Sequence, residues 1–309
     1  MAYTIDTRRL SLGLFLPIEA YQGPLATMQH HLERALQAEA AGFEALWLRD
    51  VPLHVPRFND AGQLFDPFVY MGYLAAHTSR IALATGSAIL TLRHPIHTAK
   101  AATSADALSG GRVALGVASG DRIEEFPAFG YDHDQRGELF RASFETMRRL
   151  LDDDFVEMEP THYGHLQGAG DLLPKAAVGG RIPMYVTGYA GGQRLDWIAR
   201  HADGWIFFPQ EIAKVSRRMY EYRAALERQQ QPRKPYLQSL YIDLLADPDA
   251  PAQPLHLGFR SGRHHLIDHL KRLEVLGVNH VMLVLRFSSR PIKTVLDELG
   301  REVLPHFSC

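Results

Sequence analysis

The chain has 309 residues, 46% hydrophobic and 22% charged, which is the balance of a globular protein with a sizeable core rather than of a disordered or fibrous chain. Its formal net charge of -2 provides no basic field for nucleic acid or anionic lipid, so we expect neither as a partner. No apolar run reaches the length of a membrane span, and the N-terminus lacks a secretion-signal pattern. The one cysteine, Cys309, forms no intrachain disulfide, so we expect a cytoplasmic protein.

Short apolar runs alternate with helix-length amphipathic segments along the chain. Runs that are apolar on both faces are typical of parallel strands covered by helices. Eight such runs alternating with helices predict a single-domain α/β fold, a (β/α)8 TIM barrel over residues 1–309. The expected strands are residues 10–17, 44–50, 81–90, 112–120, 183–188, 203–209, 237–247 and 280–287.

Glycine, proline and capping residues predict where several helices begin and end. The segment 27–43 has helical periodicity and is expected to stop at Gly42, because a left-handed residue commonly ends a helix. Asp66 followed by Pro67 predicts a helix start. Gly110 and Gly277 predict the ends of two later helices.

Residues 155–181 interrupt the alternation. This segment lies before the fifth expected strand, is rich in Gly and His, and has no clear periodicity. A connection of that length in a compact domain is usually a lid, a binding loop or a small inserted hairpin. We interpret it as a lid or insertion loop.

The residues that follow the strands are the candidates for chemistry, because catalytic groups of a barrel lie at the carboxyl ends of its strands. Here these positions are polar but poor in metal ligands, and the first strand ends at Pro17 instead of a His-x-His pair. We therefore expect no metal site. A metal-dependent hydrolase remains a weak alternative, which bound zinc would revive.

The sequence "TGYAGGQR" follows the fifth strand and precedes a helix expected to begin around Gln193. Its glycines would let the backbone approach a ligand, and exposed amides at a helix start favour an anion. With the similar exit at Ser119 and Gly120, the pattern favours a two-sided phosphate pocket. An ordinary strand-to-helix turn would need the same small residues.

The stretches "AEAAGFEALWLRD", "RHPIHTAKAATSADALSGGRVALGVASG" and "IARHADGWIFF" together resemble the bacterial luciferase-like flavin monooxygenases, over about residues 10–304. The resemblance implies a barrel that binds reduced FMN, or in some branches a deazaflavin coenzyme. It also implies a bulge with a non-prolyl cis peptide at Gly86 and Ser87, against the flavin ring. By the same resemblance, the fourth strand contributes Ala118, Ser119 and Gly120. The phosphate loop would be Gly188, Tyr189, Ala190, Gly191, Gly192, Gln193 and Arg194.

The sequence departs from the light-emitting members of that family at two positions. Ser119 stands where they have a basic residue that contacts phosphate, so Arg194 or Arg122 would have to supply the charge. Asp50 stands where they have a catalytic histidine at the end of the second strand, so we do not expect luminescence. Asp50 and His54, four residues on, are our candidates for proton transfer.

The predicted function is oxygenation of a small organic substrate by reduced FMN and dioxygen, the cofactor supplying the difficult chemistry. A separate flavin reductase would be a partner, and a homodimer would form through the helices beside the second and third strands, as the resemblance implies. Two alternatives stay open. One is deazaflavin-dependent hydride transfer, and the other is a non-catalytic flavin-binding or partner subunit.

Overall fold

The computed structural model describes residues 3–178 and 180–307; Cys309 lies outside the described residues. Within that part of the chain, eight parallel strands close into a barrel in the order β1-β2-β3-β4-β7-β8-β9-β12, with β12 pairing back onto β1. The predicted TIM barrel is confirmed. Its strands are β1 Ser11–Phe15, β2 Ala45–Leu48, β3 Ala82–Ile89, β4 Val113–Ala118, β7 Met184–Thr187, β8 Gly204–Phe207, β9 Tyr236–Leu244 and β12 His280–Val284.

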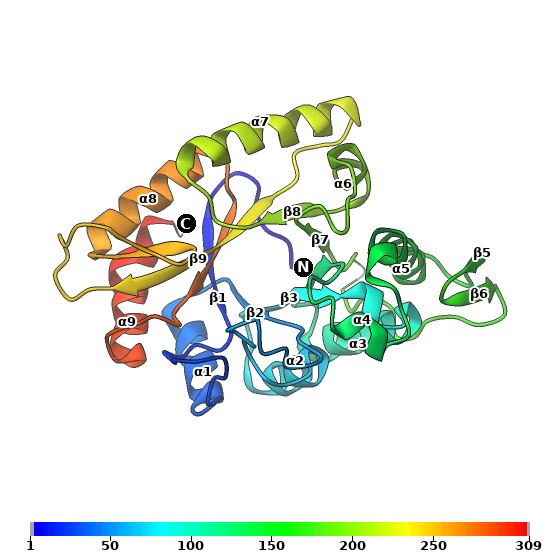
Figure 1. Cartoon of the computed structure of the whole chain (residues 1–309), viewed down its shortest axis with the longest axis horizontal. Coiled ribbons are helices and arrows are strands. Elements are labelled where there is room, and N and C mark those ends of the chain that lie inside the picture. The colour runs from blue at the N-terminus through cyan, green and yellow to red at the C-terminus, as the bar shows by residue number, and fades with distance from the viewer. Residues whose placement is uncertain (1–2, 179, 308–309) are drawn as a thin grey trace.

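Helices surround the barrel (Figure 1). Their apolar faces pack against the outward-facing side chains of the strands in one core cluster. The helices are α1 His31–Ala41, α2 Pro67–His77, α3 Pro95–Ser109, α4 Glu125–Ala128, α5 Arg136–Asp152, α6 Leu195–His201, α7 Ile212–Arg228, α8 Arg263–Leu276 and α9 Ile292–Glu298. Among the described residues, no helix is long and apolar enough to cross a membrane.

The helix boundaries follow the predicted signals. Gly42, Gly110 and Gly277 each adopt the left-handed conformation directly after α1, α3 and α8. The Asp66 side chain accepts hydrogen bonds from the amides of Phe68 and Val69, which caps α2. These local contacts determine where α1, α3 and α8 end and where α2 begins.

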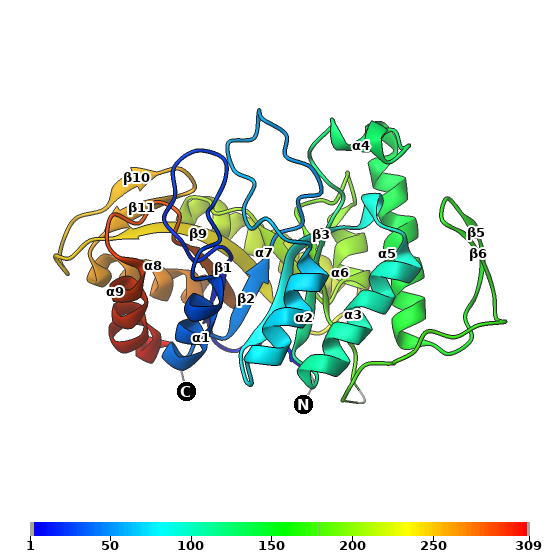
Figure 2. The same ribbon diagram turned by 90° about the horizontal axis from the view of Figure 1, so that it is seen from below.

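Residues 155–181 contain an antiparallel hairpin, β5 Glu157–Thr161 and β6 Gly164–Gln167. Figures 1 and 2 both place it at the outer edge of the molecule, beyond α5. A second small addition, β10 Gln253–Leu255 and β11 Gly258–Ser261, extends the sheet from β9.

The barrel interior at the amino ends of the strands is filled by side chains. His280 is fully buried there; its Nε2 accepts from Trp47 Nε1 at 3.0 Å, and its Nδ1 lies 2.7 Å from Ser11 Oγ. Burial lowers the pKa of His280 to about 3, so the ring is neutral. The centre of this end is therefore packed, and the larger of two cavities, about 810 Å³ against about 230 Å³, lies at the other end.

Candidate functional site

A cavity of about 810 Å³ opens at the carboxyl ends of the strands. It is large enough for a flavin-sized ring system together with a small substrate. Eight of the residues predicted for the site line it, namely Asp50, Gly86, Ser87, Ala118, Ser119, Gly120, Gly188 and Tyr189. Six others do not, namely His54, Ala190, Gly191, Gly192, Gln193 and Arg194.

The β3 wall of the cavity is a bulge. The register between β3 and β4 shifts between Thr85 and Ala88, and the Gly86–Ser87 peptide is cis, as the sequence predicted. A Cβ on Gly86 would lie 2.6 Å from the Phe15 ring, so only glycine fits there. Ser87 Oγ lies 2.5 Å from Thr187 Oγ1 of β7, and this hydroxyl pair faces the cavity from two strands.

The β4 wall ends in Ser119 and Gly120. Ser119 is buried, and its carbonyl accepts a hydrogen bond from Thr91 Oγ1 at 2.9 Å. Gly120 has φ +81°, and a Cβ there would lie 3.0 Å from Ile89. Glycine is therefore favoured at position 120, because the chain adopts a left-handed conformation as it leaves β4.

The β7 exit lines the cavity only through its first residues, Gly188 and Tyr189. Gly191 packs against Gly137 at the start of α5, where a Cβ on Gly137 would lie 2.4 Å from the Gly191 carbonyl oxygen. The buried Gln193 side chain donates to the Gly137 carbonyl and accepts from Arg141. These two residues attach the turn to α5 and are turned away from the cavity.

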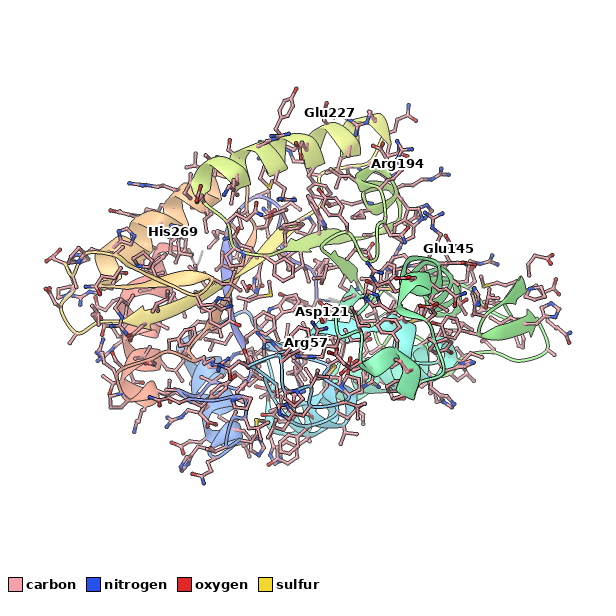
Figure 3. The ribbon with its side chains drawn as sticks, viewed as in Figure 1. Arg57, Asp121, Glu145, Arg194, Glu227 and His269 are labelled. Atoms are coloured by element: carbon pink, nitrogen blue, oxygen red, sulfur yellow. The ribbon has the colours of Figure 1, made fainter. Side chains whose placement is uncertain are left out.

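The expected start of the next helix at Gln193 is wrong by two residues, since α6 begins at Leu195. Arg194 precedes it and is exposed. Figure 3 shows Arg194 at the outer edge of the molecule beside α6, whereas Arg57 and Asp121 lie near the middle of the barrel mouth. Of the two arginines considered as phosphate ligands, only Arg122 lines the cavity.

Asp50 lies at the end of β2 with its side chain 1% exposed. Its oxygens accept from Arg93 Nε and Nη2 at 2.7 and 2.8 Å and from the Ile89 amide at 3.0 Å. Arg93 also donates to Asp66; burial alone would lower the pKa of Arg93, but Asp50 and Asp66 outweigh burial and raise it. Asp50 thus anchors the end of β3 to the α2 cap through three hydrogen bonds, two to Oδ2 and one to Oδ1.

The loop between β2 and α2 covers part of the cavity. Figure 2 shows this segment rising over the same end of the barrel as α4. Arg57, Phe58, Asn59 and Asp60 of the loop line the cavity, while His54 is exposed. None of the described residues of 155–181 lines it. The role of that hairpin as a lid stays a prediction.

Sequence reasoning missed an ionic cluster on the wall formed by β9, β12 and β2. Arg49 Nη1 and Arg286 Nη1 lie 2.8 and 3.1 Å from the same oxygen of Asp60, Oδ2. The other oxygen, Oδ1, accepts from Tyr21 Oη at 2.6 Å. The signal was present, since Arg49 comes directly after β2 and Arg286 two residues after β12, but their common partner lies in a loop without periodicity.

The pKa of Asp60 reflects its neighbours. Burial alone would raise it, but the charge of Arg49 and the hydrogen bond from Tyr21 outweigh burial and lower the pKa from 3.8 to about 2. Asp60 is therefore ionised at neutral pH. The pKa of Tyr21 is raised by burial and by the neighbouring Asp60 charge, so Tyr21 remains a hydrogen-bond donor.

The opposite wall fits a flat, anionic cofactor. Gly188 has φ +57°, and a Cβ there would meet nothing within 4 Å, so the cavity is open beside its backbone. Arg122 lines the same cavity, and its buried Nε has no hydrogen-bond partner among the described residues. Arg122 Nη2 donates to the Asp60 carbonyl at 3.3 Å. An open backbone surface in a cavity that a guanidinium also lines suits a planar ring that carries negative charge.

A (β/α)8 barrel with a cavity at the carboxyl ends of its strands that both polar and apolar side chains line has the architecture of the barrel enzymes. The family model "Luciferase-like monooxygenase" matches residues 10–282. This chain belongs to that family, whose members include flavin monooxygenases and F420-dependent oxidoreductases.

Among curated relatives, the Mycobacterium tuberculosis protein named "Uncharacterized protein Rv0953c" is 35% identical over 154 residues. That match covers 48% of this chain and 51% of the relative, so the chain spans about half the length of the curated relatives it matches.

Two solved structures illustrate the fold. An F420-dependent secondary alcohol dehydrogenase in complex with an F420-acetone adduct matches with a TM-score of 0.79 and 17% identity, covering 97% of this chain and 100% of that one. The oxygenating constituent of 3,6-diketocamphane monooxygenase from Pseudomonas putida, in complex with FMN, matches with a TM-score of 0.73 and 14% identity. It covers 97% of this chain and 99% of that one. At these identities the likeness extends to the fold alone.

Proposed function

We propose that this protein is a monooxygenase that uses reduced FMN and dioxygen to oxygenate a small organic substrate. The observation that carries the proposal is the cavity wall formed by β3, β4 and β7, where backbone and small side chains border open space next to Arg122. Membership of the luciferase-like family supports the cofactor class. The overall reaction would convert reduced FMN, dioxygen and substrate into oxidised FMN, oxygenated substrate and water.

The residues on that wall have distinct proposed roles. Ser87 and Thr187 would donate or accept hydrogen bonds at the ring edge, because their hydroxyl groups meet at the cavity surface. Gly86, Ala118, Gly120 and Gly188 would allow the ring to lie against backbone. Arg122 would pair with negative charge on the cofactor. Proton transfer by Asp50 or His54 stays a proposal, tested by substitution.

The cover of the cavity would exclude water from the reaction. The loop between β2 and α2 already reaches over the cavity through Phe58 and Asp60. For the subunit arrangement we propose a homodimer through α2, where Val69 is 73% and Tyr73 42% exposed. A separate flavin reductase would supply reduced FMN.

The second candidate is deazaflavin-dependent hydride transfer, suggested by the likeness in fold to an F420-dependent dehydrogenase over nearly the whole chain. The two candidate functions are distinguished by anaerobic titration of the purified protein with reduced FMN and with reduced F420. Tryptophan fluorescence reports the binding of each cofactor. Admitting air then tests for dioxygen uptake that depends on the protein. Tighter binding of FMN with dioxygen uptake supports the monooxygenase. Preference for F420 without uptake supports hydride transfer, and binding of neither overturns both.

A further inference from the structure

The ionic cluster of Arg49, Asp60 and Arg286 carries more positive than negative charge. Both guanidinium groups contact Oδ2 of Asp60, and no other carboxylate within residues 3–178 and 180–307 lies within 4.0 Å of either arginine. The Arg286 side chain is 9% exposed, and its Nε lacks a partner within the described residues. Its Nη2 donates to the Gly23 and Asn59 carbonyls, both at 2.7 Å, and the Arg49 side chain is 23% exposed. A buried and a half-buried cation that share one carboxylate leave one positive charge without an ionic partner within the described residues, which favours an anion nearby.

The remaining capacity of Asp60 is already used. Its Oδ1 accepts from Tyr21 and from the Gly62 amide at 2.6 and 2.9 Å, so this carboxylate offers no second oxygen to the arginines. Tyr241 Oη accepts from Arg49 Nη2 at 2.7 Å, as a hydroxyl and not a carboxylate. The two arginines, which line the cavity, therefore retain capacity for an anion that enters it.

The cluster spans the mouth of the barrel. Arg286 follows β12, which is four positions from β4 in the closed order of strands, whereas Arg49 follows β2, the neighbour of β3. Arg122, after β4, contacts the loop that carries Asp60, because its Nη2 donates to the Asp60 carbonyl at 3.3 Å. A ligand that reaches Arg286 therefore lies on the side of the mouth opposite Ser119 and Gly120.

Aromatic side chains adjoin the two arginines. Phe15 and Phe287 line the cavity, the Arg49 guanidinium lies 5.6 Å from the Phe15 ring centre, and that of Arg286 lies 5.5 Å from the Phe287 ring centre. A ligand here meets fixed positive charge beside apolar surface, the combination that selects an amphipathic anion.

We propose that the substrate is a small organic acid whose carboxylate binds Arg49 and Arg286, with its apolar body against Phe15 and Phe287. This inference rests on the proposed function, because it assigns the wall formed by β3, β4 and β7 to the cofactor. The acid group would fix which carbon faces the cofactor wall. Arg49 and Arg286 are then specificity-determining residues.

The test uses benzoate and its neutral isostere benzamide as probes, with dissociation constants from ligand-observed NMR. Wild-type protein is expected to bind benzoate roughly tenfold or more tighter than benzamide, because charge-assisted hydrogen bonds form only with the anion. Arg286→Met and Arg49→Met are expected to abolish that preference. Arg228→Met is the matched control, since Arg228 is an exposed arginine on α7 paired with Asp196.

Asp60→Asn gives the opposite sign and keeps the test decisive if an arginine variant fails to fold. The substitution removes the competing carboxylate, while the amide oxygen can still accept from Tyr21. Benzoate should therefore bind tighter, and the affinity for benzamide should not change. A purely structural role would not improve binding of the anion alone. Equal binding of both probes, no benzoate binding at millimolar concentration, or weaker benzoate binding by Asp60→Asn would overturn the proposal.

Adding FMN shows whether the two arginines bind the substrate or the phosphate of the cofactor. If benzoate still binds at saturating FMN, the arginines serve the substrate; if FMN displaces it, they hold the cofactor phosphate and the proposal is overturned. Failure of the flavin assignment has a different signature, because neither FMN nor F420 would then bind while the preference for benzoate persists.

Discussion

Asp50 shows how a residue predicted for proton transfer is held in the structure by its hydrogen bonds. All of its contacts are with Arg93 and the Ile89 amide, and its side chain is shielded from solvent. An anchored carboxylate of this kind positions the strand that bears Gly86 and Ser87. Whether it also moves a proton is decided by turnover in an Asn variant once the substrate is known.

We predict that Asp50→Asn destabilises the protein by about 3 kcal/mol, because it leaves Arg93 partly buried without its main partner. Asp66→Asn is the matched control. Asp66 pairs with the same arginine but its side chain is 40% exposed, and Asn still caps a helix, so we expect a loss of about 1 kcal/mol or less. Urea unfolding measures both. Equal losses would contradict the anchoring role of Asp50.

His280 provides a second prediction at this scale, on pH. Its pKa is about 3 in the folded chain against an ordinary 6.5, so the unfolded chain binds the extra proton between these values. The stability that neutral His280 contributes is therefore fully present above pH 6.5 and is lost as the pH falls toward 3. His280→Gln retains an acceptor for Trp47 and a donor for Ser11 without titrating. We expect it to reduce the slope of unfolding free energy against pH, near pH 5, by about 1.4 kcal/mol per unit. An unchanged slope would mean that His280 is protonated in the fold.

Among the elements, the turn after β7 depends on its contact with α5. Gly191 and Gly137 touch backbone to backbone, and Gln193 joins the same two segments. Both glycines are needed because any Cβ would separate the turn from the helix. The geometry of Gly188 at the cavity therefore depends on a helix that contributes no lining residue of its own.

We predict that Gly137→Ala displaces this turn, destabilises the protein by about 1–3 kcal/mol, and weakens binding of reduced FMN. Gly72→Ala is the control: Gly72 lies inside α2 with nothing within 4 Å of the added Cβ, so stability should rise by about 0.5–1 kcal/mol with binding unchanged. Thermal unfolding and a fluorescence titration measure the pair. A stabilised Gly137→Ala with normal binding would refute the coupling.

In the whole molecule, the β5–β6 hairpin is a part separate from the barrel. The β5–β6 hairpin contacts the barrel through Tyr163, whose Oη donates to the Thr91 carbonyl, and Thr91 in turn donates to Ser119. The hairpin is thus a support beside the β4 exit in this conformation. The cavity is covered instead by the loop between β2 and α2.

We predict that replacing residues 157–167 with a short Gly-Ser linker lowers the unfolding temperature, through loss of Tyr163 packing, but leaves the dissociation constant for the cofactor within about threefold. The physical reason is that no described residue of 155–181 lines the cavity. Calorimetry and the fluorescence titration measure the two quantities. A loss of cofactor affinity well beyond tenfold would show that the segment closes over the site as a lid.

Local sequence predicted the barrel, the places of its strands and the caps at Gly42, Asp66, Gly110 and Gly277, and the family resemblance predicted the bulge at Gly86 and Ser87. These features follow from short-range periodicity, turn chemistry and a resemblance carried by local motifs. Which strand-end residues face the cavity depends instead on tertiary packing. Gln193 and Arg194 turn away, since the direction of a turn depends on the helix it packs against. Arg49 and Arg286 meet at Asp60 because barrel closure brings β12 beside β1, a contact across more than two hundred residues that no local pattern encodes.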